Sequence, residues 1–71
     1  MDLFTITAID MHSSDTMSRT FSTDSVIQFK DSVIEFEDDL PYRRYELVTD
    51  EFVDDYPKEI IEVLDDHEVT Y

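Results

Sequence analysis

The acidic side chains are the residues of this sequence that most clearly suggest a chemistry. The chain of 71 residues holds 19 Asp and Glu against five Lys and Arg, so its formal net charge at pH 7 is −14. Residues 35–71 carry fourteen acids and three bases, whereas residues 1–34 carry five acids and two bases. A charge of this size attracts basic partners and repels DNA, RNA and anionic membranes.

The acids of the second half form two rows when they are placed on the expected elements. On a strand over residues 32–38 they would recur at every second position, about 6.8 Å apart, and on a helix over residues 56–67 they would follow an i, i+4, i+7, i+11 stripe. The strand row lies on a face that carries Asp31, Val33, Glu35, Glu37 and Asp39, and the helix row contains Asp55, Glu59, Glu62 and Asp66. Both spacings are close to the distance between successive phosphates of one nucleic-acid strand.

We therefore predict that these rows, with the acids next to them, bind a basic partner. The predicted partner-binding residues are Glu35, Glu37, Asp38, Asp39, Asp54, Asp55, Glu59, Glu62, Asp65 and Asp66. Like charges one turn apart cost a helix roughly 0.2–0.5 kcal/mol per pair, so the rows are expected to have a use. A simple solvated surface and an adaptation to high salt are the alternatives, and the second predicts unfolding at low salt.

Conventional active-site chemistry has little support in this sequence. There is no cysteine for a disulfide or a thiolate metal site, and no glycine for a loop that cradles phosphate. His12 stands beside Ser13 and Ser14 without an orienting carboxylate in view. The acid pairs at 54–55 and 65–66 could bind a cation only adventitiously, because the spacing of an EF-hand loop is missing. The sequence predicts no enzyme, no cofactor and no dedicated metal site.

The few basic residues are expected to serve the fold. We predict that Arg43 and Arg44 form ion pairs across the sheet, with Glu35, Glu37 or Glu46 as partners. His67 falls at the end of the expected helix, where a cation interacts favourably with the last carbonyl groups.

The elements that would carry these residues begin with strands. Residues 3–9 alternate in the way of a β-strand, and residues 10–19 lack a period and indicate a loop. The segments DSVIQFK and DSVIEFE, residues 24–37, repeat each other and predict a hairpin of strands at 21–29 and 32–38 that turns at Lys30-Asp31. In these strands Ile27 would share a face with Phe29, and Ile34 with Phe36.

The second half of the chain changes from a strand pattern to a helix pattern. Residues 42–49 predict another strand after Pro41, and residues 56–67 a helix with Asp55 as its N-cap and Pro57 in its first turn. Residues 50–55 would form a short turn, and residues 68–71 could add an edge strand. The predicted class is α+β, with a small antiparallel sheet of three to four strands and a C-terminal helix.

Length and composition predict one folded domain over residues 1–71. The hydrophobic fraction is 41% and the aromatic fraction 13%, which suffices for a core. A domain this small buries only about 60% of its unfolded surface, so a homodimer would be a reasonable way to gain stability. The N-terminus lacks the positive charge of a signal peptide, and no apolar run reaches bilayer length. We expect a cytoplasmic protein.

Taken together, the stretches DSVIEFEDD and DDYPKEIIEVLDD in a small chain without glycine resemble the acidic DNA-mimic proteins with which bacteriophages inhibit host DNA-binding proteins. Within that group the chain is most similar to the small acidic early inhibitors of the histone-like HU protein from Bacillus-infecting phages. The resemblance covers about half of the chain and lies in size, charge and the acidic rows. It implies a basic DNA-binding protein as partner, an HU-like nucleoid protein first, no direct binding of nucleic acid, and a location in the host cytoplasm or nucleoid.

A different class of function remains open. A small acidic regulatory module, antitoxin-like or RNA-polymerase-binding, would dock by adding its edge strand to a partner sheet and would use its acids for solubility and steering. Mimicry predicts competition with DNA and steep salt dependence, whereas strand addition predicts weak salt dependence.

Overall fold

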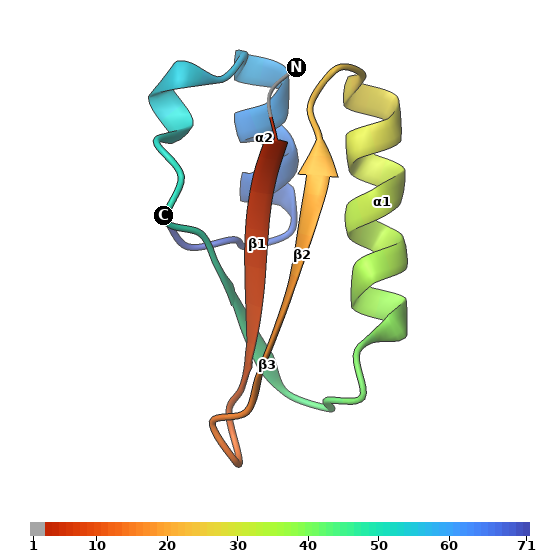
Figure 1. Cartoon of the computed structure of the whole chain (residues 1–71), viewed down its shortest axis with the longest axis vertical. Coiled ribbons are helices and arrows are strands. Elements are labelled where there is room, and N and C mark those ends of the chain that lie inside the picture. The colour runs from red at the N-terminus through yellow and green to blue at the C-terminus, as the bar shows by residue number, and fades with distance from the viewer. Residues whose placement is uncertain (1–2) are drawn as a thin grey trace.

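A computed structural model of the chain describes residues 3–71 and contains three strands and two α-helices (Figure 1). The elements in chain order are β1 (Leu3–Asp10), β2 (Thr16–Ser22), α1 (Val26–Asp39), β3 (Tyr45–Val48), a 3₁₀ turn η1 (Val53–Asp55) and α2 (Lys58–Asp66). The three-stranded antiparallel sheet and the C-terminal helix confirm the predicted α+β class. None of the helices within the described residues is long and apolar enough to cross a bilayer.

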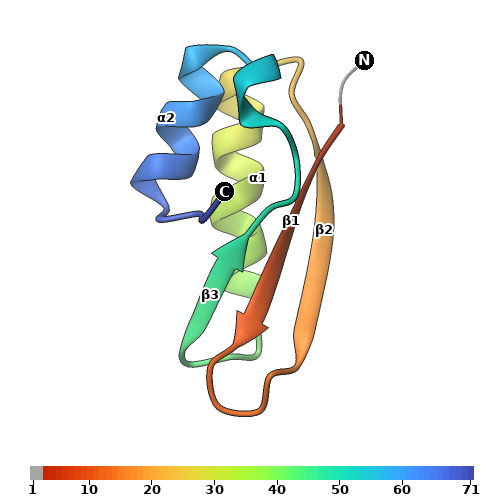
Figure 2. The same ribbon diagram turned by 90° about the vertical axis from the view of Figure 1, so that its left-hand side faces the viewer.

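The central strand of the sheet is β1, in the order β2-β1-β3, and both of its neighbours run antiparallel to it. Figure 2 shows the two α-helices on one side of the sheet, with the other side open. The period-two pattern of β1 explains this layering, because Phe4, Ile6 and Ala8 are buried under the helices while Thr5 and Thr7 stand on the open side.

A single cluster of buried side chains lies between the sheet and the helices. Phe29 of α1 is at its centre, with its ring in T-shaped contact with the rings of Phe4 and Phe21. The cluster consists of Phe4, Ile6, Ala8, Phe21, Phe29, Val33, Phe36, Leu47, Ile60, Val63, Leu64 and Val69. Residues from all three strands and both helices contribute to it, so each element depends on the others for its position.

The repeated segment forms one α-helix, α1, and the predicted hairpin at 21–29 and 32–38 is wrong. The reason is the length of the repeat. Seven residues make nearly two helical turns, so the equivalent residues Val26 and Val33, and likewise Phe29 and Phe36, fall on the same helix face. That face is the one buried against the sheet.

The other consequences of the helix follow from its geometry. Lys30-Asp31 is not a turn but lies inside α1, and the start of the helix is capped by Ser25, whose Oγ accepts a hydrogen bond from the N–H of Gln28. Ile27, expected to share a face with Phe29, is 75% exposed, and Ile34 is 41% exposed. Neighbours two apart lie on different sides of a helix, whereas they share a face of a strand.

The segment 10–19, predicted as a loop, contains the first half of β2. The apolar alternation that indicates a strand is weak in β2. Its side facing away from the core carries the hydroxyl residues Thr16, Ser18 and Thr20, and Phe21 is its buried apolar residue. The remaining loop is a tight turn in which Ser14 adopts a positive φ of 67°.

The C-terminal half follows the prediction more closely. The strand expected at 42–49 is present as the shorter β3, and the helix expected at 56–67 is present as α2. The N-cap position is Pro57, and no side chain caps the helix, so the prediction of Asp55 as cap is wrong: Asp55 ends η1. The predicted edge strand at 68–71 is reduced to one parallel bridge between Val48 and Thr70.

Candidate partner-binding surface

Exposed carboxylates gather on the two helices and on η1, the turn before α2. We call this set the acidic helical face: Asp31, Glu35 and Asp38 on α1, Asp54 and Asp55 on η1, and Glu59, Glu62, Asp65 and Asp66 on α2. All nine are exposed. Residues 50–68 contribute nine acids and one lysine, so they hold nearly half of the 19 acids of the chain.

The buried core determines where these carboxylates point. In α1 the stripe of Phe29, Val33 and Phe36 packs inward, and in α2 the stripe of Ile60, Val63 and Leu64 does the same. The acids occupy the remaining positions of each helix and therefore face away from the sheet. Along α1, Asp31, Glu35 and Asp38 are spaced by rises of about 6 and 4.5 Å, so their row is a helical stripe.

The two predicted rows are thus only partly present. The strand row is broken, because residues 31–39 are helical: Val33, assigned to the acidic face, is buried, and Glu37 is turned inward. The helix row loses Asp55 to η1 but keeps Glu59, Glu62 and Asp66 on α2. Asp31 also belongs to the exposed stripe of α1, although the predicted binding set did not include it. The seven-residue repeat was the signal that could have shown Asp31 to lie on this helical stripe.

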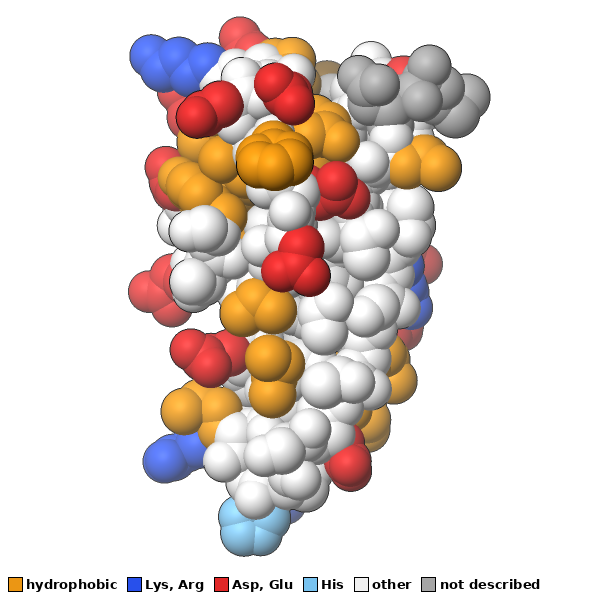
Figure 3. All heavy atoms as spheres, turned by 60° about the vertical axis from the view of Figure 1, so that its left-hand side comes forward, with side chains coloured by type: hydrophobic (Ala, Val, Ile, Leu, Met, Phe, Trp, Pro, Cys, Tyr) orange, Lys and Arg blue, Asp and Glu red, His pale blue; other side chains and the backbone are white. Residues whose placement is uncertain are grey.

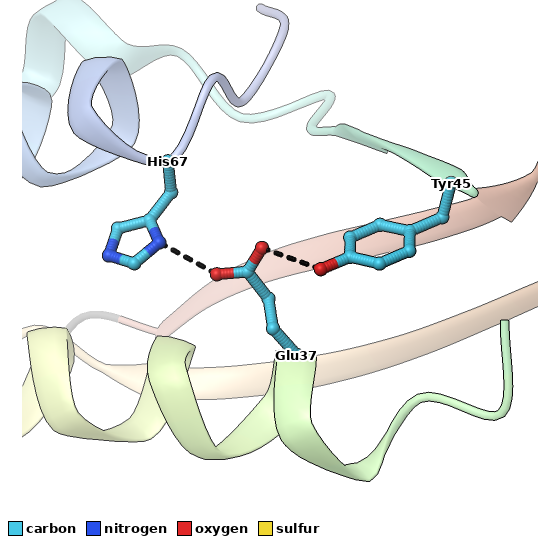
Figure 4. Close-up of polar contacts among 3 residues, drawn as sticks. All are labelled: Glu37, Tyr45 and His67. Carbon is cyan, nitrogen blue, oxygen red and sulfur yellow. Dashed lines mark hydrogen bonds and ion pairs between the residues drawn. The ribbon is translucent and has the colours of Figure 1, made fainter. Parts of the chain in front are cut away.

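Glu37 is held within the molecule by two side chains (Figure 4). One carboxylate oxygen accepts a hydrogen bond of 2.9 Å from the hydroxyl of Tyr45, and the other lies 2.7 Å from Nδ1 of His67. The side chains of Glu37 and His67 are only 22% and 18% exposed. Glu37 therefore joins α1 to β3 and to the end of α2, and its carboxylate is already satisfied.

His67 differs from its predicted role. Its ring contacts Glu37 and not the last carbonyl groups of α2, which are met instead by the backbone: the N–H of His67 donates to the carbonyl of Val63. A carboxylate at 2.7 Å offers the ring a stronger partner than the helix end does.

Burial and the hydrogen bond to Glu37 raise the pKa of Tyr45 from 10.0 to about 12. The folded state therefore holds this proton more tightly than the unfolded state, so the resulting stabilisation is complete below pH 10 and is lost as the pH rises from 10 to 12. We expect the free energy of unfolding to fall over this range, and to fall less in Tyr45→Phe, which has no proton to lose. Urea titrations followed by circular dichroism at pH 9, about 11 and 12 would measure the difference; parallel curves for the two proteins would contradict it.

Two further members of the predicted binding set are also engaged. Asp39 accepts from Nη2 of Arg19 at 3.2 Å, and the guanidinium of Arg19 stands 5.1 Å from the ring centroid of Phe36. Asp65 accepts from the hydroxyl of Tyr71 at 2.9 Å, and this bond raises the pKa of Tyr71. Both sites are largely exposed, so these contacts can be exchanged for those of a partner at small cost.

The side chains of the other members of the predicted set make no hydrogen bond or ion pair within residues 3–71. They are Glu35, Asp38, Asp54, Asp55, Glu59, Glu62 and Asp66. The predicted ion pairs of Arg43 and Arg44 are likewise not found among the described residues, whose only ion pairs are Arg19–Asp39 and His67–Glu37. Arg43 and Arg44 lie in the loop before β3, where they are exposed.

The open side of the sheet has a different character. Thr5 pairs with Thr20 and Thr7 with Ser18, and the paired hydroxyls are hydrogen-bonded at 3.2 and 2.8 Å. Figure 3 shows an uncharged, mostly white expanse in the right-hand part of the view, while red carboxylates stand near the middle of the view and along its left side. The charge of the molecule is therefore concentrated on the helical layer and its surroundings.

No group of three or more His, Cys, Asp or Glu side chains within residues 3–71 is arranged to hold a metal ion. Ser13 uses its hydroxyl to donate to Asp10 at 2.6 Å, which makes it part of the β1–β2 turn. Comparison with known proteins gives no match to a family model, to a curated protein or to a solved structure.

Proposed function

We propose that this protein is a DNA mimic that occupies the basic DNA-binding surface of a host DNA-binding protein and displaces DNA, with an HU-like nucleoid protein as the first candidate. One observation carries the proposal: exposed carboxylates without side-chain partners are concentrated on the two helices and η1, while the open side of β1 and β2 carries paired Thr and Ser side chains and no charge. A purely solubilising charge would have no reason to avoid one side of the molecule.

The physical basis is the release of counterions. A protein that binds DNA gains much of its affinity because its Lys and Arg displace cations condensed around the phosphates. A dense set of carboxylates holds counterions in the same way, and Lys or Arg of the partner releases them. Each carboxylate can also accept charge-assisted hydrogen bonds, which are roughly twice as strong as neutral ones.

Rigidity is the second requirement, because ordering a flexible acidic tail on binding would consume part of the gain. The helices that carry the acids are anchored at several points. Phe29 and Phe36 are buried, Glu37 joins α1 to His67 and Tyr45, and Arg19 joins β2 to Asp39. The acidic helical face is therefore presented by a framework that needs no rearrangement before it binds.

The test is capture from a bacterial lysate on the immobilised protein, with elution in a salt gradient and identification by mass spectrometry. The proposal expects a basic DNA-binding protein that elutes in the salt gradient and is absent from the eluate when duplex DNA is added to the lysate. A captured protein that stays bound in the presence of excess DNA would contradict it.

One observation favours the alternative of strand addition. β2 pairs with β1 on one side only, so it is an edge strand, and unpaired strand edges are templates for pairing with another chain. The N–H of Asp10 donates to the carbonyl of Asp15, so these two residues form a hydrogen-bonded pair. Hydrogen-bonded and non-hydrogen-bonded pairs alternate along an antiparallel ladder, which makes Thr5 and Thr20 a non-hydrogen-bonded pair. The N–H of Thr20 therefore points away from β1. A regulatory module of this kind would bind its partner through such groups.

Proline at Thr20 separates the two functions. It removes one outward N–H of β2 without touching a carboxylate. The DNA-mimic proposal expects Thr20→Pro to change the affinity for the captured partner less than twofold, provided that circular dichroism shows an intact fold. A loss of tenfold or more in a folded variant, with weak dependence on salt, would favour strand addition instead.

A further inference from the structure

A cavity of about 510 Å³ lies between the β1–β2 turn and the loop that joins α1 to β3. It is formed by residues 10–12 of the turn and residues 41–44 of the loop. Both segments lie at the lower end of the molecule in Figure 1, beyond the C-terminal end of α1. No residue of the acidic helical face lines this cavity.

The cavity carries two arginines next to each other. Arg43 and Arg44 both line it, both are exposed, and neither is in an ion pair within residues 3–71. His12 stands on the opposite wall. In a chain with only five Lys and Arg, the placement of two of them in one cavity is the strongest local concentration of positive charge.

The acid in the lining, Asp10, is occupied by the turn. Its carboxylate accepts from the hydroxyl of Ser13 at 2.6 Å and from the N–H of Ser13 at 3.2 Å. The bond from the Ser13 hydroxyl is the main cause that lowers the pKa of Asp10. Asp10 therefore has its hydrogen bonds in the turn, and the donors of the arginines are left for another anion.

The remaining lining is apolar. Met11 is 65% exposed although it is hydrophobic, and Pro41 and Tyr42 complete the wall on the loop side. Sites for small molecules combine such apolar walls with a few polar groups that fix orientation. A guanidinium presents a planar fork of donors that matches carboxylate and phosphate.

The two walls are connected by the backbone. The N–H of Met11 donates to the carbonyl of Arg44 at 3.0 Å, which fixes the turn against the loop. Within the turn, the N–H of Asp10 donates to the carbonyl of Asp15 at 2.8 Å, and the N–H of Ser14 to the carbonyl of Asp10. The site is preorganised, so binding of a ligand would cost little conformational entropy.

We propose that this cavity is a binding site for an anionic group, carboxylate or phosphate, carried on an aromatic or aliphatic body. The anion binds the guanidinium groups of Arg43 and Arg44, and the body contacts Met11 and Tyr42. This site has the opposite charge preference to the acidic helical face and does not depend on the proposed function.

The test is a titration of the ¹⁵N-labelled chain with phenyl phosphate, benzoate and inorganic phosphate, followed by amide chemical shifts at about 0.15 M ionic strength, where charges beyond about 8 Å are screened. The proposal expects saturable shifts confined to residues 10–15 and 41–45. Phenyl phosphate and benzoate identify which anion is preferred. Inorganic phosphate should bind at least threefold more weakly than phenyl phosphate; equal binding would overturn the role of the apolar wall.

Paired variants decide whether the arginines act as a site. Arg43→Gln with Arg44→Gln should weaken phenyl phosphate at least tenfold, whereas Lys30→Gln with Lys58→Gln, which removes the same charge from the exposed helix surfaces, should weaken it less than twofold. Shifts that do not saturate, or equal losses in the two double variants, would overturn the proposal. All four substituted residues are exposed, so both double variants are expected to fold.

Discussion

Replacing Phe29 by alanine is expected to lower the free energy of unfolding by about 3–5 kcal/mol, the usual cost of removing a buried phenyl ring. Phe29 is fully buried, and its ring lies 5.8 Å from those of both Phe4 and Phe21. Proteins gain only about 0.05–0.15 kcal/mol of stability per residue, so a domain of this size has little to lose. Urea denaturation followed by circular dichroism should find the variant largely unfolded even without denaturant.

Ile27→Ala is the matched control for this prediction. Ile27 stands two positions earlier in the same helix but is 75% exposed, so its replacement should change stability by no more than about 0.5 kcal/mol. A strand at 21–29 would place Ile27 and Phe29 on one face and make both costly. Similar large losses for the two variants would therefore contradict the helical structure of the repeat.

The second large effect is expected at the acidic helical face. Changing Glu59 and Glu62 to glutamine should weaken binding to the captured partner by about 3 kcal/mol or more, because each charge-assisted hydrogen bond lost from a desolvated contact costs about 1.5–3 kcal/mol. The fold should survive, since the two carboxylates are exposed and like charges this close repel each other. Dissociation constants at two salt concentrations, with circular dichroism as a folding control, would measure the change.

The control for net charge is Asp15→Asn with Glu46→Gln. These acids are exposed, belong to neither helix, and make no side-chain hydrogen bond or ion pair within residues 3–71. Asp10 would be a poor choice because its carboxylate holds the β1–β2 turn. The control should affect mainly the rate of association, through weaker steering. Equal losses of affinity in the two double variants would mean that diffuse charge does the binding.

Sequence reasoning predicted those elements whose period was unambiguous. β1 alternates strictly, and α2 repeats its apolar residues at three- and four-residue spacings, so both were placed within about two residues. The repeat in α1 is rich in Val, Ile and Phe, which favour strands, whereas its spacing of seven residues favours a single helix face. Tertiary packing on the sheet decides in favour of the helix.

The candidate surface was predicted in part for the same reason. The carboxylates of α2 were predicted on the correct element because the helix itself was predicted. The row from Asp31 to Asp39 was predicted on a strand, but these residues are part of α1. The engagement of Glu37 was not predictable from pattern, since its partner His67 lies 30 residues away and meets it only when α1 and α2 pack together. The basic partner is a prediction from the charge composition alone.

Displacement of DNA tests the central claim most directly. A fluorescently labelled duplex bound to a purified bacterial HU protein has a high anisotropy, and the account predicts that adding this protein returns the anisotropy to that of free DNA, with the Glu59→Gln, Glu62→Gln variant requiring a much higher concentration. The protein alone should leave the anisotropy of the duplex unchanged, because its charge of −14 repels phosphate. An anisotropy that stays high at a large excess of the protein, or that rises when the protein is mixed with DNA alone, would contradict the account.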